Sequence, residues 1–293
     1  MGSACIIRQL KLMNEAKQLL LDALETRWKK FHSELKTCRA EFSEEAVHDL
    51  RVATRRLLAL FDLLRSILIH NRIQKIRRTL KEQLDDLDDL RDTQVMLADI
   101  SEFIQDIPSL RVFQERLQKN EKKLLRQTRK RIQSRDPSKL AARIKKVSAM
   151  LADLPEPALR EHIFTATDER FARVLQAHNA VDLEHIPSIH KLRIAFKKFR
   201  YTIEIVNPLI ADFPAENFER MHSYQSMMGD IQDLEVASQN FAELTNASHP
   251  DLEPASIHYA SRLRTAVFRF VEDKGEAFTF WRNTPDQPFP WEK

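Results

Sequence analysis

Glycine is almost absent from this sequence. Three glycines occur in 293 residues, at Gly2, Gly229 and Gly275. Tight turns and phosphate-cradling loops need residues that tolerate a positive φ, so this scarcity argues against a fold rich in β-sheet. Neither a Walker loop nor a dinucleotide-binding fingerprint can be built from so few glycines. We therefore expect an all-α protein that lacks the common nucleotide-binding signatures.

Cysteines and long apolar runs are also scarce. Cys5 and Cys38 are the only cysteines, which argues against a disulfide framework or a thiolate zinc site and favours an intracellular protein. The start of the chain has no hydrophobic stretch of signal-peptide length, and no segment reaches the roughly 18 apolar residues of a membrane span. We expect a soluble, cytoplasmic protein with no membrane partner.

Charge of one sign is not in large excess either. Charged residues make up 31% of the chain, yet the formal net charge is only +4. An anion-binding site must therefore come from local clustering of cations and not from the overall balance.

Prolines divide the chain into segments whose apolar residues recur three and four positions apart, which is the period of an amphipathic helix. The last residues, "NTPDQPFPWEK", are expected to form an extended tail. The spacing predicts helices near residues 8–40, 44–70, 72–105, 109–135, 158–180, 187–211, 214–246 and 254–283, and a looser linker with a short helix at 138–153.

Two motifs occur twice, in the same order. "VHDLRVATRR" at 47–56 returns as "IHKLRIAFKK" at 189–198, and "LDDLRDTQV" at 87–95 returns as "MGDIQDLEV" at 228–236. Both repeats lie about 140 residues apart, which indicates duplication of an ancestral helical unit. We expect two four-helix bundles related by a pseudo-two-fold axis, with one half at 1–155 and the other, including a short tail, at 156–293.

The first repeated motif combines an apolar seam with a cationic stripe. On a helical wheel, His48, Arg51 and Arg55 fall within about 60° of one another and away from the seam. The second copy places His190, Arg193 and Lys197 in the same way, and Arg200 extends that stripe. The two seams are Val47, Leu50, Thr54, Leu57, Phe61 and Leu64, and Ile189, Leu192, Phe196, Phe199, Ile203 and Val206.

A cationic stripe on one helix is most often a solvated face, but these two stripes favour an anion site. Like charges at this spacing repel by a few tenths of a kcal/mol per pair, and no acid lies among them to compensate. The pattern occurs twice and is rich in arginine, whose planar guanidinium grips phosphate oxygens with two hydrogen bonds. A nearby polyanion would also favour protonation of the histidines.

Two further helices add cations. In the helix expected at 109–135, a basic side carries Arg116, Lys119, Lys123, Arg126 and Lys130, opposite Phe113, Leu117, Leu124 and Thr128. The last helix carries His258, Arg262 and Arg269 along one face. If the two halves pack symmetrically, we expect these stripes to converge on a shared groove.

The strings "VHDLRVATRRL" and "IHKLRIAFKKFRY", each followed by an aspartate-containing repeat, resemble the two halves of a CHAD domain, the conserved histidine α-helical domain. The resemblance covers roughly residues 10–283. It implies two pseudo-symmetric four-helix bundles around a basic cavity and binding of inorganic polyphosphate, often on polyphosphate granules. Two departures are Leu58, where the family often has arginine, and Asp88, which stands opposite Gly229.

The candidate site combines the motif residues with the basic side chains of the other helices. Four aspartates of the second repeat are expected to orient the guanidinium groups: Asp89, Asp92, Asp230 and Asp233. The predicted polyphosphate ligands are His48, Arg51, Arg55, Arg56, His190, Arg193, Lys197, Lys198, Arg200, Lys119, Lys123, Arg126, Arg262 and Arg269.

Two other interpretations stay open. The string "DDLDD" at Asp85–Asp89 fits the aspartate-rich pattern with which all-α isoprenoid synthases hold magnesium and diphosphate, although "GDIQD" at 229–233 is a poor second motif. A basic helical groove also suits nucleic acid, although Tyr201 is the one aromatic candidate for base stacking on the stripes.

We favour a binding protein over an enzyme, whose reaction would be isoprenoid diphosphate chemistry or polyphosphate hydrolysis. No catalytic residue, metal or cofactor is expected. Glu45 and His48 form half of a di-iron motif, but the second copy has Pro187 and Ser188 before Ile189 and no matching glutamate. The expected partner is inorganic polyphosphate or another phosphate-rich polyanion, with nucleic acid as the alternative; the sequence leaves the oligomeric state open.

Overall fold

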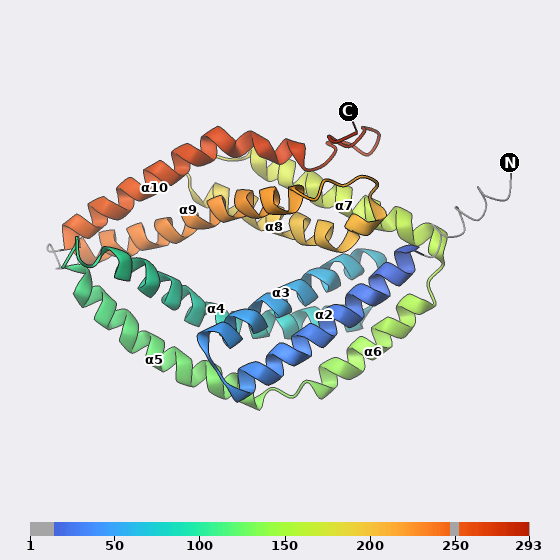
Figure 1. Cartoon of the computed structure of the whole chain (residues 1–293), viewed down its shortest axis with the longest axis horizontal. Coiled ribbons are helices and arrows are strands. Elements are labelled where there is room, and N and C mark those ends of the chain that lie inside the picture. The colour runs from blue at the N-terminus through green and yellow to red at the C-terminus, as the bar shows by residue number, and fades with distance from the viewer. Residues whose placement is uncertain (1–14, 247–251, 293) are drawn as a thin grey trace. The chain divides into compact units, whose positions relative to one another are not determined.

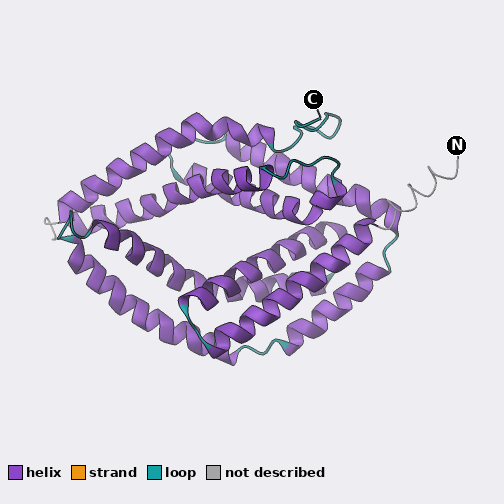
Figure 2. Cartoon of the chain, viewed as in Figure 1, coloured by secondary structure: helices purple, strands orange, loops and turns teal. Residues whose placement is uncertain are grey.

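The chain is all-α, as predicted. The computed structural model describes residues 15–246 and 252–292, and these contain helices and turns but no strand (Figure 2). The α-helices labelled in Figure 1 are α2 (Glu15–Ala40), α3 (Glu44–Ile67), α4 (Asn71–Phe103), α5 (Leu110–Ser134), α6 (Ser138–Ala152), α7 (Glu156–Asn179), α8 (Pro187–Val206), α9 (Asn217–Asn246) and α10 (Glu253–Asp273).

Most helix bounds lie close to those predicted from the sequence. Two helices end sooner than expected, because α8 is followed by a 3₁₀ turn at Asn207–Leu209 and α10 by another at Lys274–Thr279. The part of the first predicted helix before Glu15 lies outside the described residues. No helix of the described chain is both long and apolar enough to cross a bilayer.

The two motif helices begin with favourable residues. The hydroxyl of Ser43 caps α3 by accepting a hydrogen bond from the Ala46 backbone N–H at 3.1 Å. Glu44 and Glu45 follow in the first turn, where the helix dipole favours negative charge. Pro187 opens α8, at a position where a backbone N–H has no helical partner to lose.

Turns in this glycine-poor chain use other residues in the left-handed region. Phe42, between α2 and α3, has a φ of 49°, and Asp212, between α8 and α9, has the same value. An L-residue in this conformation costs roughly 1–2 kcal/mol, which the packing around each turn must offset. Two turns of the described chain are thus formed without glycine.

The described chain forms two compact units. Unit 1 comprises 1–88, 127–169 and 198–213, and unit 2 comprises 89–126, 170–197 and 214–293. In unit 1, α2 packs along α3, and in unit 2, α9 packs along α10. Neither unit coincides with the sequence halves 1–155 and 156–293, because α4, α5, α7 and α8 each contribute to both units. The duplicated pair of four-helix bundles stays a prediction from the sequence.

Both apolar seams predicted from the repeated motif are buried. Every seam residue of α3, from Val47 to Leu64, and every seam residue of α8, from Ile189 to Val206, has at most 2% of its surface exposed. Burying one such side chain contributes about 1.5–3 kcal/mol to folding. The cationic stripes are therefore fixed relative to a tightly packed core.

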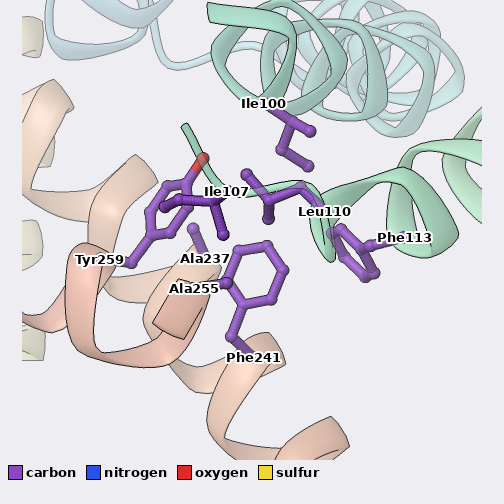
Figure 3. Packing of buried hydrophobic residues seen from close by; sticks show 8 residues of the cluster. All are labelled: Ile100, Ile107, Leu110, Phe113, Ala237, Phe241, Ala255 and Tyr259. Carbon is purple, nitrogen blue, oxygen red and sulfur yellow. The ribbon is translucent and has the colours of Figure 1, made fainter. Parts of the chain in front are cut away.

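A further cluster holds the end of α4 and the start of α5 against α9 and α10 within unit 2 (Figure 3). The ring of Phe241 lies 4.8 Å, centroid to centroid, from both Phe113 and Tyr259. The labelled side chains are Ile100, Ile107, Leu110, Phe113, Ala237, Phe241, Ala255 and Tyr259.

The C-terminal residues differ from the extended tail that the prolines predicted. They form a series of turns that fold back on the fully buried side chain of Trp281. Phe289 lies 4.7 Å from Trp281, ring to ring, and stacks on Trp291 at 4.8 Å. Three aromatic side chains thus give this segment its own packing contacts.

Candidate functional site

The first cationic stripe lies on α3 in unit 1. His48 and Arg56 are exposed, whereas Arg51 and Arg55 are partly buried. The Nε of Arg51 donates to Oδ1 of Asp88 on α4 at 2.7 Å, and Nη2 of Arg55 donates to the same oxygen at 3.4 Å. Two guanidinium groups of the first stripe thus share one carboxylate.

The second stripe begins on α8 in unit 2, where a neutral side chain replaces the carboxylate. The ring Nδ1 of His190 lies 2.5 Å from Oε1 of Gln232 on α9. The Nη1 of Arg193 donates to the same oxygen at 3.2 Å. Gln232 therefore orients both side chains without cancelling the positive charge of the guanidinium.

The guanidinium of Arg193 also packs closely over the backbone of α9 at Gly229. A Cβ added at Gly229 would lie 3.3 Å from Nε and 3.4 Å from Nη2 of Arg193. The Nε itself is buried and has no hydrogen-bond partner, and among the described residues no carboxylate forms an ion pair with Arg193. The absence of a side chain at Gly229 is what lets the guanidinium occupy this position.

Two acids lie near the second stripe without forming an ion pair with Arg193. Burial raises the pKa of Asp230, although the nearby charges of Arg193 and Arg262 act in the opposite direction. Burial likewise raises the pKa of Glu235 against the attraction of His190. Both carboxyls therefore take up protons at higher pH than free carboxyls do.

The end of the second stripe belongs to unit 1 and has its own carboxylate. The Nη1 of Arg200 contacts Oε1 of Glu204 at 2.7 Å, and Nε of Arg56 lies 3.9 Å from Oε2 of the same residue. Arg27 of α2 lies near this pair, and burial lowers its pKa. Sequence reasoning missed Glu204 and Arg27, because neither belongs to the repeated motif.

The two lysines between Arg193 and Arg200 on α8 differ in exposure. Lys197, in unit 2, is partly buried, and Lys198, in unit 1, is exposed. The unit boundary thus divides the second copy of the motif, while the whole first copy lies in unit 1.

The basic face predicted on α5 is exposed. Lys119, Lys123 and Arg126 point to solvent, and Phe113 and Thr128 are buried on the other face. Within the described chain none of these three cations forms an ion pair, so their charges are open to an external anion.

The cations predicted on α10 have different surroundings. Arg269 is exposed. Arg262 donates from Nη1 and Nη2 to the two carboxylate oxygens of Asp99 at 3.1 and 2.8 Å. The Tyr259 hydroxyl donates to Asp99 at 2.5 Å, and the guanidinium lies 4.5 Å from the centre of the Phe103 ring. Arg262 thus belongs to a bidentate ion pair between α4 and α10.

An aspartate outside the predicted set contacts two of the arginines. The contact to Arg51 and Arg55 comes from Asp88, one residue before the predicted Asp89, which is exposed. Asp92 and Asp233 are exposed too, and Asp230 lies near Arg193 without an ion pair. The sequence did carry one signal for Asp88, since it stands where the second copy has Gly229.

The aspartates at 85–89, on which the magnesium interpretation depends, have different surroundings. Asp85 is exposed, Asp86 accepts from Arg131 at 3.1 Å and also pairs with Arg135, and Asp88 faces α3. In the described residues no group of three or more histidine, cysteine, aspartate or glutamate side chains is placed to hold a metal ion.

Residues 22–242 match the CHAD domain family over most of the chain. The chain belongs to the CHAD domain family. Among solved structures, the crystal structure of the CHAD domain from the plant Ricinus communis superposes with a TM-score of 0.65 at 17% identity, covering 90% of this chain and 89% of that one. PptA from Streptomyces chartreusis gives 0.63 at 18% identity, covering 87% and 98%.

These structural similarities, at so low an identity, concern the fold of this CHAD domain alone. No curated protein matches the chain. The resemblance found from the two repeated motifs is thus confirmed at the level of the family and of the all-α fold.

Proposed function

We propose that this CHAD domain binds inorganic polyphosphate through cationic side chains of α3, α5 and α8, and that its role is binding without catalysis. The observation that carries the proposal is the guanidinium of Arg193, which is partly buried and forms no ion pair with a carboxylate of the described chain. Keeping an uncompensated charge away from water costs free energy. An external anion would offset that cost.

A chain of phosphates suits the surroundings better than a single small anion does. Arginine offers a planar fork of donors that matches phosphate oxygens. On α5, the exposed Lys119, Lys123 and Arg126 extend over roughly 10 Å of helix, so one polyanion could contact several of them. Membership of the CHAD domain family supports polyphosphate as the ligand, and association with polyphosphate granules remains a prediction of the same origin.

The test is a titration of the full chain with fluorescently labelled polyphosphate at several salt concentrations. We expect the logarithm of the affinity to fall steeply and linearly with the logarithm of the salt concentration, because neutralising several phosphates releases counterions, as it does for nucleic acids. No saturable binding at low salt, or an affinity that salt leaves unchanged, would overturn the proposal.

Two parallel assays separate the other interpretations. Competition between polyphosphate and single-stranded nucleic acid at fixed ionic strength should favour polyphosphate; a clear preference for nucleic acid would favour that ligand instead. Incubation of the chain with polyphosphate and magnesium should release no phosphate. Release that disappears in Asp85→Asn/Asp89→Asn would indicate an enzyme that uses the acidic string.

A further inference from the structure

The two copies of the cationic motif differ at one position of the helix that faces them. Aligning the second repeat places Asp88 of α4 opposite Gly229 of α9. In unit 1, the Asp88 carboxylate accepts from Arg51 at 2.7 Å and from Arg55 at 3.4 Å. In unit 2, the guanidinium of Arg193 packs over Gly229 and finds no side chain there.

We propose that the Arg193 copy is the primary phosphate-binding half-site and that Asp88 is a built-in competitor, which a phosphate group must displace before it can use Arg51 and Arg55 fully. This inference rests on the proposed function, because it assigns unequal roles to two parts of that site. It makes Asp88 and Gly229 the residues that set the strength of each half-site.

The available hydrogen-bond donors support the difference. Arg51 already donates from Nε to a carboxylate, and its side chain is only 13% exposed. Arg193 donates from Nη1 to the neutral Gln232, while its Nη2 has no hydrogen-bond partner among the described residues. A phosphate oxygen can therefore bind Arg193 without first breaking an ion pair.

The surrounding charges also favour phosphate binding at Arg193 over binding at Arg51. The carboxylate of Asp88 is 37% exposed, so it repels an approaching phosphate as well as occupying the two arginines. Near Arg193, the acids Asp230 and Glu235 both have raised pKa values because of burial, and each forms no ion pair with the arginine. Carboxylate repulsion thus acts in direct contact with the arginines of the first half-site and without such contact in the second.

The first experiment removes the competitor. Asp88→Asn keeps the size of the side chain and removes its charge, and Asp85→Asn is the matched control, because Asp85 is an exposed acid of the same string that contacts neither arginine. At fixed ionic strength we expect polyphosphate affinity to rise about tenfold in Asp88→Asn, which corresponds to about 1.4 kcal/mol, and to rise far less in Asp85→Asn. Equal increases in the two variants would overturn the inference, because they would reflect net charge alone.

The second experiment introduces the competitor into the other copy. Gly229→Asp places a carboxylate beside Arg193, and Gly229→Asn supplies the same bulk without the charge. We expect Gly229→Asp to bind about tenfold more weakly than Gly229→Asn. Circular dichroism and thermal unfolding show whether both variants fold; equal affinity of two folded variants would contradict the inference.

If substitution at Gly229 prevents folding, the comparison of Asp88→Asn with Asp85→Asn tests the inference by itself. The gain in Asp88→Asn should vanish when Arg51 and Arg55 are also replaced by alanine, because the loss of their contact with the Asp88 carboxylate is its cause. A gain that persists would overturn the proposed role of Asp88. Absence of polyphosphate binding by the unaltered chain would overturn the proposed function itself, and the inference with it. If the unaltered chain binds polyphosphate but affinity is equal in Asp88→Asn and Asp85→Asn and equal in Gly229→Asp and Gly229→Asn, the inference alone is overturned.

Discussion

Arg51 and Arg193 occupy the same place in two copies of one motif, yet they meet different neighbours. Arg51 faces the carboxylate of Asp88, and Arg193 faces the amide of Gln232 and the bare backbone of Gly229. Both arginines lie beside a buried apolar seam, so the difference comes from the opposite helix and not from their own. The same cationic residue is thus compensated in one copy and left available in the other.

Arg262 extends the comparison to a third environment. Its guanidinium forms two hydrogen bonds to Asp99 and lies over the Phe103 ring. Ion pairs of this bidentate kind have a fixed geometry and hold two helices together. Among the predicted cationic ligands, the structure therefore distinguishes those with compensated charge, such as Arg51 and Arg262, from those open to an anion, such as Arg193 and Lys123.

Removing the cations of each copy in turn should give the largest effect. We expect Arg193→Ala/Lys197→Ala to weaken polyphosphate binding about a hundredfold, which is about 2.8 kcal/mol, and Arg51→Ala/Arg55→Ala to weaken it only a few-fold. The variant that combines all four alanine substitutions should not be retained on a polyphosphate column. Helicity measured by circular dichroism is the control, and equal losses in the two double variants would show that the copies are equivalent.

Removing the charge of Asp99 should mainly affect stability. Asp99→Asn leaves the partly buried Arg262 without its carboxylate, so we expect the free energy of unfolding to fall by about 1–3 kcal/mol in urea denaturation. Polyphosphate affinity should change little. A large gain in affinity with unchanged stability would instead mean that Arg262 resembles Arg51 and belongs to the binding site.

Acidic pH should strengthen the Arg193 half-site. Because burial raises the pKa of Asp230 and of Glu235, these carboxyls take up protons at higher pH than free carboxyls do as the solution is acidified. Negative charge near Arg193 and His190 is thereby lost, and we expect polyphosphate affinity to rise a few-fold as the pH is lowered from 7 towards the range in which carboxyls titrate, about pH 4.

The matching variant for the pH experiment is Asp230→Asn/Glu235→Gln. It should bind more tightly than the unaltered chain at pH 7 and show a flatter pH dependence, measured by titration at constant ionic strength. Identical pH profiles would show that the two acids do not influence the site.

The smallest effect is expected on α5. Lys123→Ala removes one exposed charge that has no ion-pair partner in the described chain, so binding should weaken by less than about tenfold, and the slope of the salt dependence should fall by about one. Lys81→Ala, at an exposed lysine of α4 outside the predicted site, is the control. Equal effects of the two variants would indicate general attraction and not contact along α5.

The sequence predicted the helices and both buried seams because these depend on local periodicity. Val47, Leu50 and Leu57 recur with the helical period, and their burial follows directly from it. The scarcity of glycine and the positions of the prolines added the helix boundaries. The folded tail around Trp281 departs from the prediction because it depends on aromatic contacts that periodicity does not describe.

The partners of the cationic residues were harder to predict. The sequence identified Arg51 and Arg193, but it did not single out Asp88, which contacts Arg51 and lies one residue, or about 100° around the helix, from the predicted Asp89. Gln232 and Glu204 had no recognisable pattern, because a contact between two helices depends on their relative rotation and axial position. Local spacing gives the face of a helix and does not give its neighbour.

A crystal structure of the chain with a short polyphosphate would test the central claim most directly. We predict phosphate oxygens within hydrogen-bond distance of Nη2 of Arg193 and of the ring of His190, with the ion pair between Arg51 and Asp88 still intact when the ligand is limiting. Phosphates bound away from Arg193, or bound first to Arg51 with Asp88 displaced, would contradict the account.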